Sequence, residues 1–300
     1  MSSPDLQRDN LRGGLTMVLA MAFFAGEDAF LKGLTTVLPT GQLLFAVGML
    51  SALCMAVMAK ASGARIFDPK LLSRPVLLRT LGEITGGIGF ILTLQLLPLS
   101  TGAALLQTMP LAITFGAALF LGEKVGWRRW TAVAVGFLGV LVILRPTGEG
   151  FEPLAAGAAM LTVFSLALRD LSTRRVQASV HSMAIAFWGM FAYGFSGWIL
   201  MLIEGQNFVM PEKGPAISLG LAALLGLIGY YCMIVASRLG EVSAIIPYRY
   251  TRIIFALILG VLVFQETPDH YVLLGSAMIV GSGLYTFVRE RYHAFHSKTK

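Results

Sequence analysis

The sequence predicts an all-α polytopic membrane protein with ten transmembrane helices, and three observations support this. Apolar residues make up 56% of the chain and charged residues 13%, and the mean hydropathy of +0.75 is too high for a soluble surface. Ten apolar stretches follow one another, most of them long enough to cross about 30 Å of hydrocarbon as helices. Lys and Arg are concentrated in alternate gaps between these stretches.

The turn residues mark where the predicted spans begin and end. Pro39, Pro98 and Pro268 are typical turn residues after the first, third and ninth spans. Pro110 and Pro247 lie inside the fourth and ninth spans, where a missing backbone donor is expected to bend the helix. The spans cover residues 14–36, 41–58, 76–97, 101–121, 129–144, 153–173, 182–203, 216–237, 242–264 and 271–288.

The basic residues distinguish the two sides of the membrane. Only Arg145 and Lys213 lie in the odd-numbered gaps, whereas 17 of the 23 Lys and Arg residues lie in the tails, in the even-numbered gaps or at the span ends next to those gaps. By the positive-inside rule, both termini are therefore expected in the cytoplasm of a bacterial cell, with the chain in the inner membrane. The 17 residues are Arg8, Arg12, Lys60, Arg65, Lys70, Arg74, Arg79, Lys124, Arg128, Arg129, Arg174, Arg175, Arg238, Arg289, Arg291, Lys298 and Lys300.

The ten spans divide into two halves, residues 1–150 and 151–300. Because five is an odd number, a duplicated second half must enter the membrane from the opposite side. Ser100 to Glu123 aligns without a gap with Ser243 to Glu266 at an offset of 143 residues. Two apolar helices can match by chance, but the shared Ser and Glu positions argue against it. The halves are therefore predicted to be inverted repeats around a central cavity, an architecture typical of transporters.

The repeated motif also resembles a known family. Residues 99–110 read LSTGAALLQTMP and are followed by Leu-Gly-Glu at 121–123, Trp130 and Gly-Phe-Leu-Gly at 136–139. This pattern resembles the EamA-type branch of the drug/metabolite transporter superfamily, and residues 242–266 resemble its second copy. The resemblance covers essentially the whole chain and is nearest to the YddG-like amino acid exporters. It implies a ten-helix basket with a central cavity, but the motif does not specify a substrate.

One departure from the repeat concerns the position of the proline. Arg252-Ile253 stands in the second copy where the first has Met109-Pro110, and the proline of the second copy comes earlier, at Pro247. The ninth span is therefore expected to bend at a different depth from the fourth.

Ionisable residues within the first and third spans are candidates for substrate binding, because such groups are costly in lipid. Asp28 and Lys32 share one helix face, so they can neutralise each other, which leaves Glu27 free for an ammonium group or a proton. In the third span Glu83 lies about two turns from the end that is expected to be cytoplasmic. It can bind substrate, extend to the headgroups or pair with Arg79.

The ninth span contains the most informative sequence, PYRYTR at 247–252. Tyr248 and Arg252 share a face, and the arginine fork suits a substrate carboxylate. The alternative is that Arg249 and Arg252 reach the headgroups or pair with Glu241. In the sixth span, Arg169 is expected to extend to the headgroups.

Gln107 in the fourth span and Tyr230 in the eighth are predicted to add hydrogen bonds to the substrate. The predicted site thus comprises Glu27, Asp28, Glu83, Gln107, Tyr230, Tyr248 and Arg252.

These observations predict a secondary transporter that exports amino acids and related small zwitterions with broad specificity. The alternative is a carrier of a cationic or nucleoside-like metabolite such as S-adenosylmethionine, because the Asp28 to Lys32 pattern resembles proteins proposed to carry it. The chain has none of the common catalytic or metal-binding motifs, so no enzyme activity, cofactor or bound metal is expected. The positive-inside pattern accounts for the basic charge without nucleic acid. The protein is expected to be a monomer, although Gly275, Gly281 and Gly283 could form a dimer face.

Overall fold

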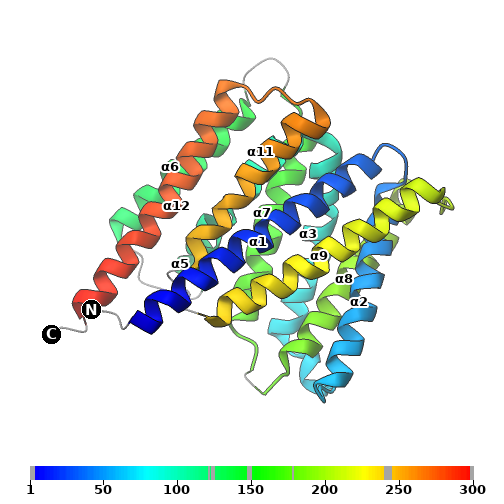
Figure 1. The fold of residues 1–300 in the computed structure, drawn as a ribbon, viewed down its shortest axis with the longest axis horizontal. Coiled ribbons are helices and arrows are strands. Elements are labelled where there is room, and N and C mark those ends of the chain that lie inside the picture. Colours follow the sequence, from blue (N-terminus) through cyan, green and yellow to red (C-terminus); the bar gives the residue numbers. More distant parts are fainter. Residues whose placement is uncertain are drawn as a thin grey trace.

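The computed structural model describes residues 4–120, 122, 126–146, 151–177, 179–239 and 245–297, with the backbone alone at 4–7, 234, 237–238, 246, 287 and 289–297. Every regular element in that part of the chain is helical, as Figure 1 shows, which confirms the predicted fold class. The elements are α1 (Pro4–Leu34), α2 (Thr40–Ala61), η1 (Pro69–Leu72), α3 (Arg74–Leu96), α4 (Leu99–Leu106), α5 (Met109–Phe120), α6 (Trp127–Leu144), α7 (Pro153–Thr173), α8 (Ser182–Glu204), α9 (Lys213–Leu239), η2 (Ile246–Tyr250), α11 (Thr251–Phe264) and α12 (His270–Ser297).

The helices form a bundle of membrane-spanning length. Within the described ranges, nine helical stretches are long and apolar enough to cross a bilayer, and the tenth predicted span lies in α12. Large apolar side chains such as Phe120, Ile203 and Leu262 are 70%, 73% and 68% exposed, as a lipid-facing surface requires. The start of α1 and the end of α12 lie near each other at one end of the bundle (Figure 1).

Each major helix pair joins the first half of the chain to the second. The pairs are α1 with α9, α2 with α8, α3 with α7, and α6 with α12, and α4 also contacts α11. Exchanging the two halves leaves this pattern unchanged, since the α1–α9 pair then becomes the α7–α3 pair. No half of the described bundle could therefore bury its helix faces without the other.

Glycines set the distance between α2 and α8. An added Cβ at Gly48 would lie 2.3 Å from the Gly194 Cα, and one at Gly197 would lie 2.3 Å from the Gly41 carbonyl oxygen. Helices in lipid gain stability mainly by close packing, so small residues at a crossing allow the backbones to touch. The same device recurs on α3, where a Cβ at Gly82 would lie 2.6 Å from a carbonyl oxygen of α7.

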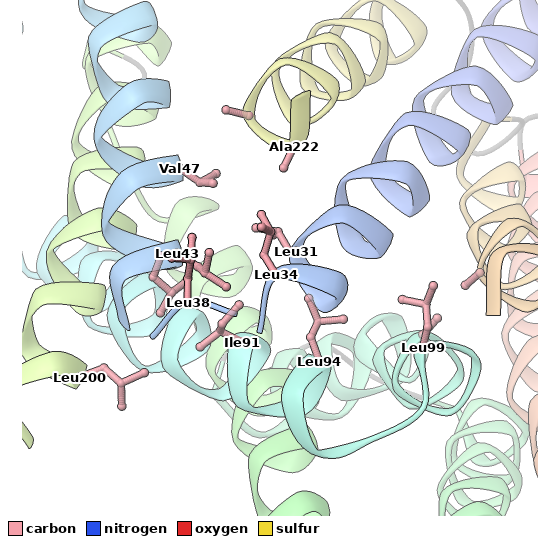
Figure 2. Packing of buried hydrophobic residues seen from close by; sticks show 14 residues of the cluster. Leu31, Leu34, Leu38, Leu43, Val47, Ile91, Leu94, Leu99, Leu200 and Ala222 are labelled. Carbon is pink, nitrogen blue, oxygen red and sulfur yellow. The ribbon is translucent and has the colours of Figure 1, made fainter. Parts of the chain in front are cut away.

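The largest apolar core lies at the end of the bundle away from the termini. Figure 2 shows Leu31 and Leu34 of α1 directed toward Leu43 of α2 and Leu94 of α3. Leu99 of α4 and Ala256 of α11 belong to the same cluster. Helices of both halves are thus joined by packing at this end.

The fourth and ninth spans are interrupted at equivalent positions. A turn at Gln107 and Thr108 separates α4 from α5, and the 3₁₀ turn η2 leads into α11 at Thr251. Thr108 and Thr251, which are 143 residues apart, both donate a hydroxyl hydrogen bond to the carbonyl three residues earlier. As predicted, the two distortions differ in depth: the 3₁₀ turn of Pro247 begins at Ile246, which is equivalent to Ala103 inside α4, although both distortions end at the equivalent threonine.

A Gly48→Val substitution is expected to destabilise the protein by forcing α2 and α8 apart. Overpacking typically costs about 1–3 kcal/mol, and a contact with rigid backbone leaves little room for relief. The measurement is the thermal unfolding midpoint of the purified protein in detergent. Gly220→Val is the matched control, because nothing lies within 4 Å of a Cβ added there. Equal midpoints for the two variants would contradict the proposed packing constraint.

Candidate functional site

Asp28 of α1 and Arg252 of α11 form a buried ion pair between the two halves. The Arg252 Nη2 donates to both carboxylate oxygens at 2.7 Å, and Nε donates to Oδ2 at 3.0 Å. The Asp28 side chain is 3% exposed and that of Arg252 23%. The guanidinium also lies 5.4 Å from the centre of the Phe24 ring. Two of the three guanidinium nitrogens of Arg252 are thus engaged by protein.

Lys32 is not the partner of Asp28, although their spacing places them on one helix face. Its ammonium instead donates to the Leu94 carbonyl at 3.0 Å and the Leu97 carbonyl at 2.6 Å, at the end of α3. The guanidinium of Arg252 binds the Asp28 carboxylate through two nitrogens in one plane, a two-point contact that a single ammonium cannot make. The predicted self-neutralising pair is therefore wrong.

Glu27 is an acid without a partner in the described part of the chain. Its carboxylate lies against the backbone of α9, since a Cβ added at Gly226 would be 2.5 Å from Oε1. No hydrogen bond or ion pair joins it to another described side chain. The charged groups that act on it electrostatically are Asp28 and Arg252. An unpaired carboxylate within a span is costly unless a substrate, water or a proton compensates it.

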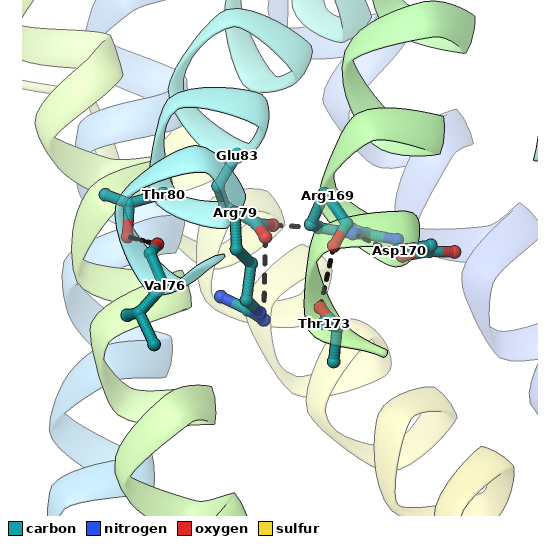
Figure 3. A network of polar contacts seen from close by, with 7 residues as sticks. All are labelled: Val76, Arg79, Thr80, Glu83, Arg169, Asp170 and Thr173. Carbon is teal, nitrogen blue, oxygen red and sulfur yellow. Dashed lines mark hydrogen bonds and ion pairs between the residues drawn. The ribbon is translucent and has the colours of Figure 1, made fainter. Parts of the chain in front are cut away.

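A second charged network joins α3 to α7 (Figure 3). Glu83 lies between two arginines, 3.7 Å from the Arg79 Nη2 and 3.4 Å from the Arg169 Nη1. The Arg169 Nε donates to Asp170 at 2.8 Å. Arg169 was expected to extend to the headgroups, but it points into the bundle because Glu83 and Asp170 both attract it. The alternative that Glu83 pairs with Arg79 is confirmed.

This network retains unsatisfied hydrogen-bonding capacity. The Arg79 Nε and the Glu83 Oε2 are buried without a hydrogen-bond partner. The Arg79 guanidinium also lies against α8, because a Cβ at Gly189 would be 2.8 Å from its Nη1. A buried polar atom without a partner is unusual and marks a place where water or a ligand can bind.

Two tyrosines lie among these charges. Tyr230 of α9 is within electrostatic reach of Arg79, Glu83 and Arg169. Tyr193 of α8 was not predicted, and the charges of Glu27, of Asp28 in the first ion pair and of Glu83 in the second network all act on it. In the sequence Tyr193 is one aromatic residue in an apolar run, so no pattern distinguished it.

The interrupted spans meet at Gln107 and Arg249. The Gln107 side-chain amide donates to the Arg249 carbonyl oxygen at 2.9 Å, across the boundary between the halves. The Arg249 guanidinium forms no hydrogen bond or ion pair with the described residues, although the charges of Asp170, Arg169 and Arg252 reach it. Arg249 thus has no ion-pair partner among the described residues, and Asp170 is the opposite charge that acts on it most strongly.

The other predicted residues lie apart from this centre. Tyr248 packs with Met17, Met21 and Ile245 in an apolar cluster between α1 and α9, and its ring touches Gly14. Glu123, Glu241, Val242 and Ser243 lie outside the described residues. Among the described residues, no group of three His, Cys, Asp or Glu side chains could hold a metal ion.

Comparisons with known proteins give the family. The sequence model of the EamA-like transporter family matches residues 11–145 and again 153–288. The chain is 24% identical over 221 residues to an S-adenosylmethionine uptake transporter of Rickettsia conorii, covering 73% of this chain and 74% of that protein. It is 30% identical over 200 residues to a riboflavin transporter of Rhizobium johnstonii, covering 66% and 64%.

Two further matches extend over almost the whole chain. A pseudopaline exporter of Pseudomonas aeruginosa is 24% identical over 281 residues, covering 91% of this chain and 95% of the exporter. A protein of known crystal structure superposes with a TM-score of 0.64 at 18% identity, covering 95% of this chain and 98% of the other, which shows a shared fold. The closeness to the YddG-like exporters stays a prediction. The chain is a multi-pass membrane transporter that belongs to the EamA-like family of the drug/metabolite transporter superfamily.

Proposed function

We propose that this transporter carries small zwitterions of the amino-acid type across the bacterial inner membrane, with export as its direction. One observation carries the proposal: Glu27 and Arg249 are ionisable residues without partners in the described chain, and they come from opposite halves. An α-ammonium group and an α-carboxylate would neutralise both. A substrate that bridges the halves in this way is suited to alternating access between them.

The structure supports a division of roles between the two arginines of the ninth span. Arg252 is already held by Asp28 through its Nε and Nη2. We therefore assign the substrate carboxylate to Arg249, with Gln107 beside it, and treat the Asp28–Arg252 pair as the element that positions α1 against α11. Glu83 is shared by two arginines, which leaves Glu27 as the acid for the substrate ammonium group.

Tyr230 and Tyr193 would supply hydrogen bonds that adapt to different substrates. Both lie within reach of the charges on the facing helices. Few fixed polar groups and many apolar contacts favour broad specificity, because the substrate side chain then meets no strict partner.

The transport cycle is proposed to be a rocking of inverted halves, residues 1–150 and 151–300. Two separate matches to the family model and the exchange-symmetric helix pairing support this organisation. The basic residues favour cytoplasmic termini, which lie at the same end of the bundle (Figure 1).

S-adenosylmethionine is the second candidate substrate. It carries an α-ammonium carboxylate as well as a sulfonium cation, so the same two residues, Glu27 and Arg249, would bind it. Several similar proteins are named as S-adenosylmethionine uptake transporters. This candidate differs from the first in the substrate and not in the site.

Neutralising either unpaired charge is expected to abolish amino acid transport. Glu27→Gln and Arg249→Gln each remove one ionic contact to the substrate, and a contact to a charged group contributes about 1.5–3 kcal/mol, or roughly a tenfold to hundredfold change in affinity. The measurement is uptake of a panel of labelled amino acids into liposomes containing the pure protein. Arg128→Gln, at the exposed start of α6, is the control. Wild-type rates in both site variants would exclude the proposed binding residues.

The Asp28–Arg252 pair is expected to behave as a structural unit. Asp28→Asn should lower the thermal unfolding midpoint strongly, because a buried charge without its partner costs about 3–5 kcal/mol. The double variant Asp28→Asn with Arg252→Gln should recover most of that loss, since no charge remains unpaired. If the double variant is no more stable than the single one, the two residues are not coupled in the folded protein.

Competition distinguishes the two substrate candidates. Excess unlabelled S-adenosylmethionine is expected to reduce uptake of a labelled amino acid only slightly if simple amino acids are the preferred cargo. Strong inhibition, together with direct uptake of labelled S-adenosylmethionine and weak flux of simple amino acids, would favour the second candidate.

A further inference from the structure

Glu266, just after α11, binds the first residues of α4 in the other half of the chain. Its Oε1 accepts the Leu99 backbone N–H at 2.5 Å, and its Oε2 accepts the Ser100 N–H at 3.0 Å and the Ser100 hydroxyl at 2.6 Å. These donors form the N-terminus of a helix, where unpaired N–H groups and the helix dipole favour a negative charge. One carboxylate therefore makes three charge-assisted hydrogen bonds across the boundary between the halves.

The backbone around Glu266 is shaped for this contact. Gln265 has a left-handed conformation with φ of 54°, and the Glu266 N–H returns to the Gly260 carbonyl at 2.9 Å. A Cβ on Gly260 would lie 2.5 Å from the Glu266 Oε2 and 3.6 Å from the Ser100 Cβ. Only glycine at this position allows the carboxylate to lie between α11 and α4.

Lys32 holds the same corner from the first half. Its ammonium binds the Leu94 and Leu97 carbonyls, immediately before the residues that Glu266 binds, and the two opposite charges attract. The corner between α3 and α4 is therefore fixed by α1 on one side and by the end of α11 on the other. Leu99, at this corner, belongs to the same apolar cluster as Ala256 of α11.

We infer that Glu266 is the positioning residue that closes the transporter at the end away from the termini, and that its contact with Leu99 and Ser100 must break in each transport cycle. This contact is called the Glu266 latch below. The inference rests on the alternating access of the proposed function, because α4 and α11 belong to the halves that must separate at this end.

The latch also gives a physical meaning to the repeated sequence motif. Ser100 of the first copy and Glu266 of the second contact each other across the halves. Gly122, which is 143 residues before Gln265, has the same left-handed conformation, with φ of 66°. In both copies, therefore, the residue that precedes the glutamate in the sequence has a left-handed conformation.

Cysteine labelling tests the latch without any substrate. In a variant lacking Cys54 and Cys232, an Ala256→Cys reporter lies one turn from Gly260 and is fully buried. Adding Glu266→Gln should speed its reaction with a water-soluble maleimide about tenfold, because the neutral amide forms weaker hydrogen bonds and has a single acceptor oxygen. Asp269→Asn is the control, since that carboxylate binds Arg145 and Val272 of the α6–α12 pair. Unchanged labelling in the Glu266 variant would overturn the inference.

A reversible cross-link tests whether the latch must open. Ser100→Cys with Gly260→Cys replaces the Glu266 contact by a disulfide, because a side chain at 260 takes the place of the carboxylate. The Ser100 Cβ lies 3.6 Å from a Cβ added at 260, within the range of disulfides. The oxidised protein in liposomes should carry no labelled amino acid, and a reducing agent should restore flux. Full flux in the oxidised protein would overturn the inference. Absence of flux even after reduction would count against the proposed substrate, and the labelling rates would then decide on the latch by themselves.

Discussion

Charge compensation inside lipid is the constraint on which the rest of this structure depends. A buried ion is stable there only beside an opposite charge or a polar path, because lipid cannot solvate it. Asp28 meets this requirement through Arg252, and Glu83 through Arg79 and Arg169. In each network one arginine, Arg252 or Arg169, lies on a helix of the other half, so compensating the charges also joins the halves.

Close backbone contact makes these ion pairs possible. Side chains reach across only where the helices approach, and glycines provide the approach between α2 and α8 and between α3 and α7. Lipid tails are as apolar as leucine, so packing, and not expulsion from water, holds such helices together. This packing explains the glycines of α3, since Gly82 lies directly against the backbone of α7. Glu83 is the acidic residue on the same helix.

The internal repeat is visible in contacts as well as in sequence. Thr108 and Thr251 end the interruptions of the two spans with the same hydroxyl hydrogen bond, and Gly122 and Gln265 share a left-handed φ. The two copies nevertheless differ in chemistry. Arg252 stands where the first copy has a methionine, and it binds Asp28. The equivalent position of the first copy therefore cannot form such an ion pair. A duplicated scaffold has thus acquired an asymmetric polar centre.

Much of the fold follows from the sequence alone. Hydropathy located the spans, because a helix must match the bilayer thickness, and the aligned Ser and Glu positions indicated the repeat. The residues that carry charge in the spans were also legible, since Glu27, Asp28, Glu83 and Arg252 are conspicuous in apolar surroundings. The sequence did not show which of these charged residues pair with which partner. Spacing within a helix favoured Lys32 for Asp28, but the stronger partner came from a helix 224 residues away.

Pairing depends on distances between helices, which local sequence does not encode. Tyr193 and Arg249 became part of the centre only through the helices packed against them, and Arg169 turned inward because two carboxylates lie there. The chain therefore specifies which helices form and which groups need compensation. The packing of the two halves specifies which partner each group receives, because only contact across the halves brings opposite charges within hydrogen-bonding distance.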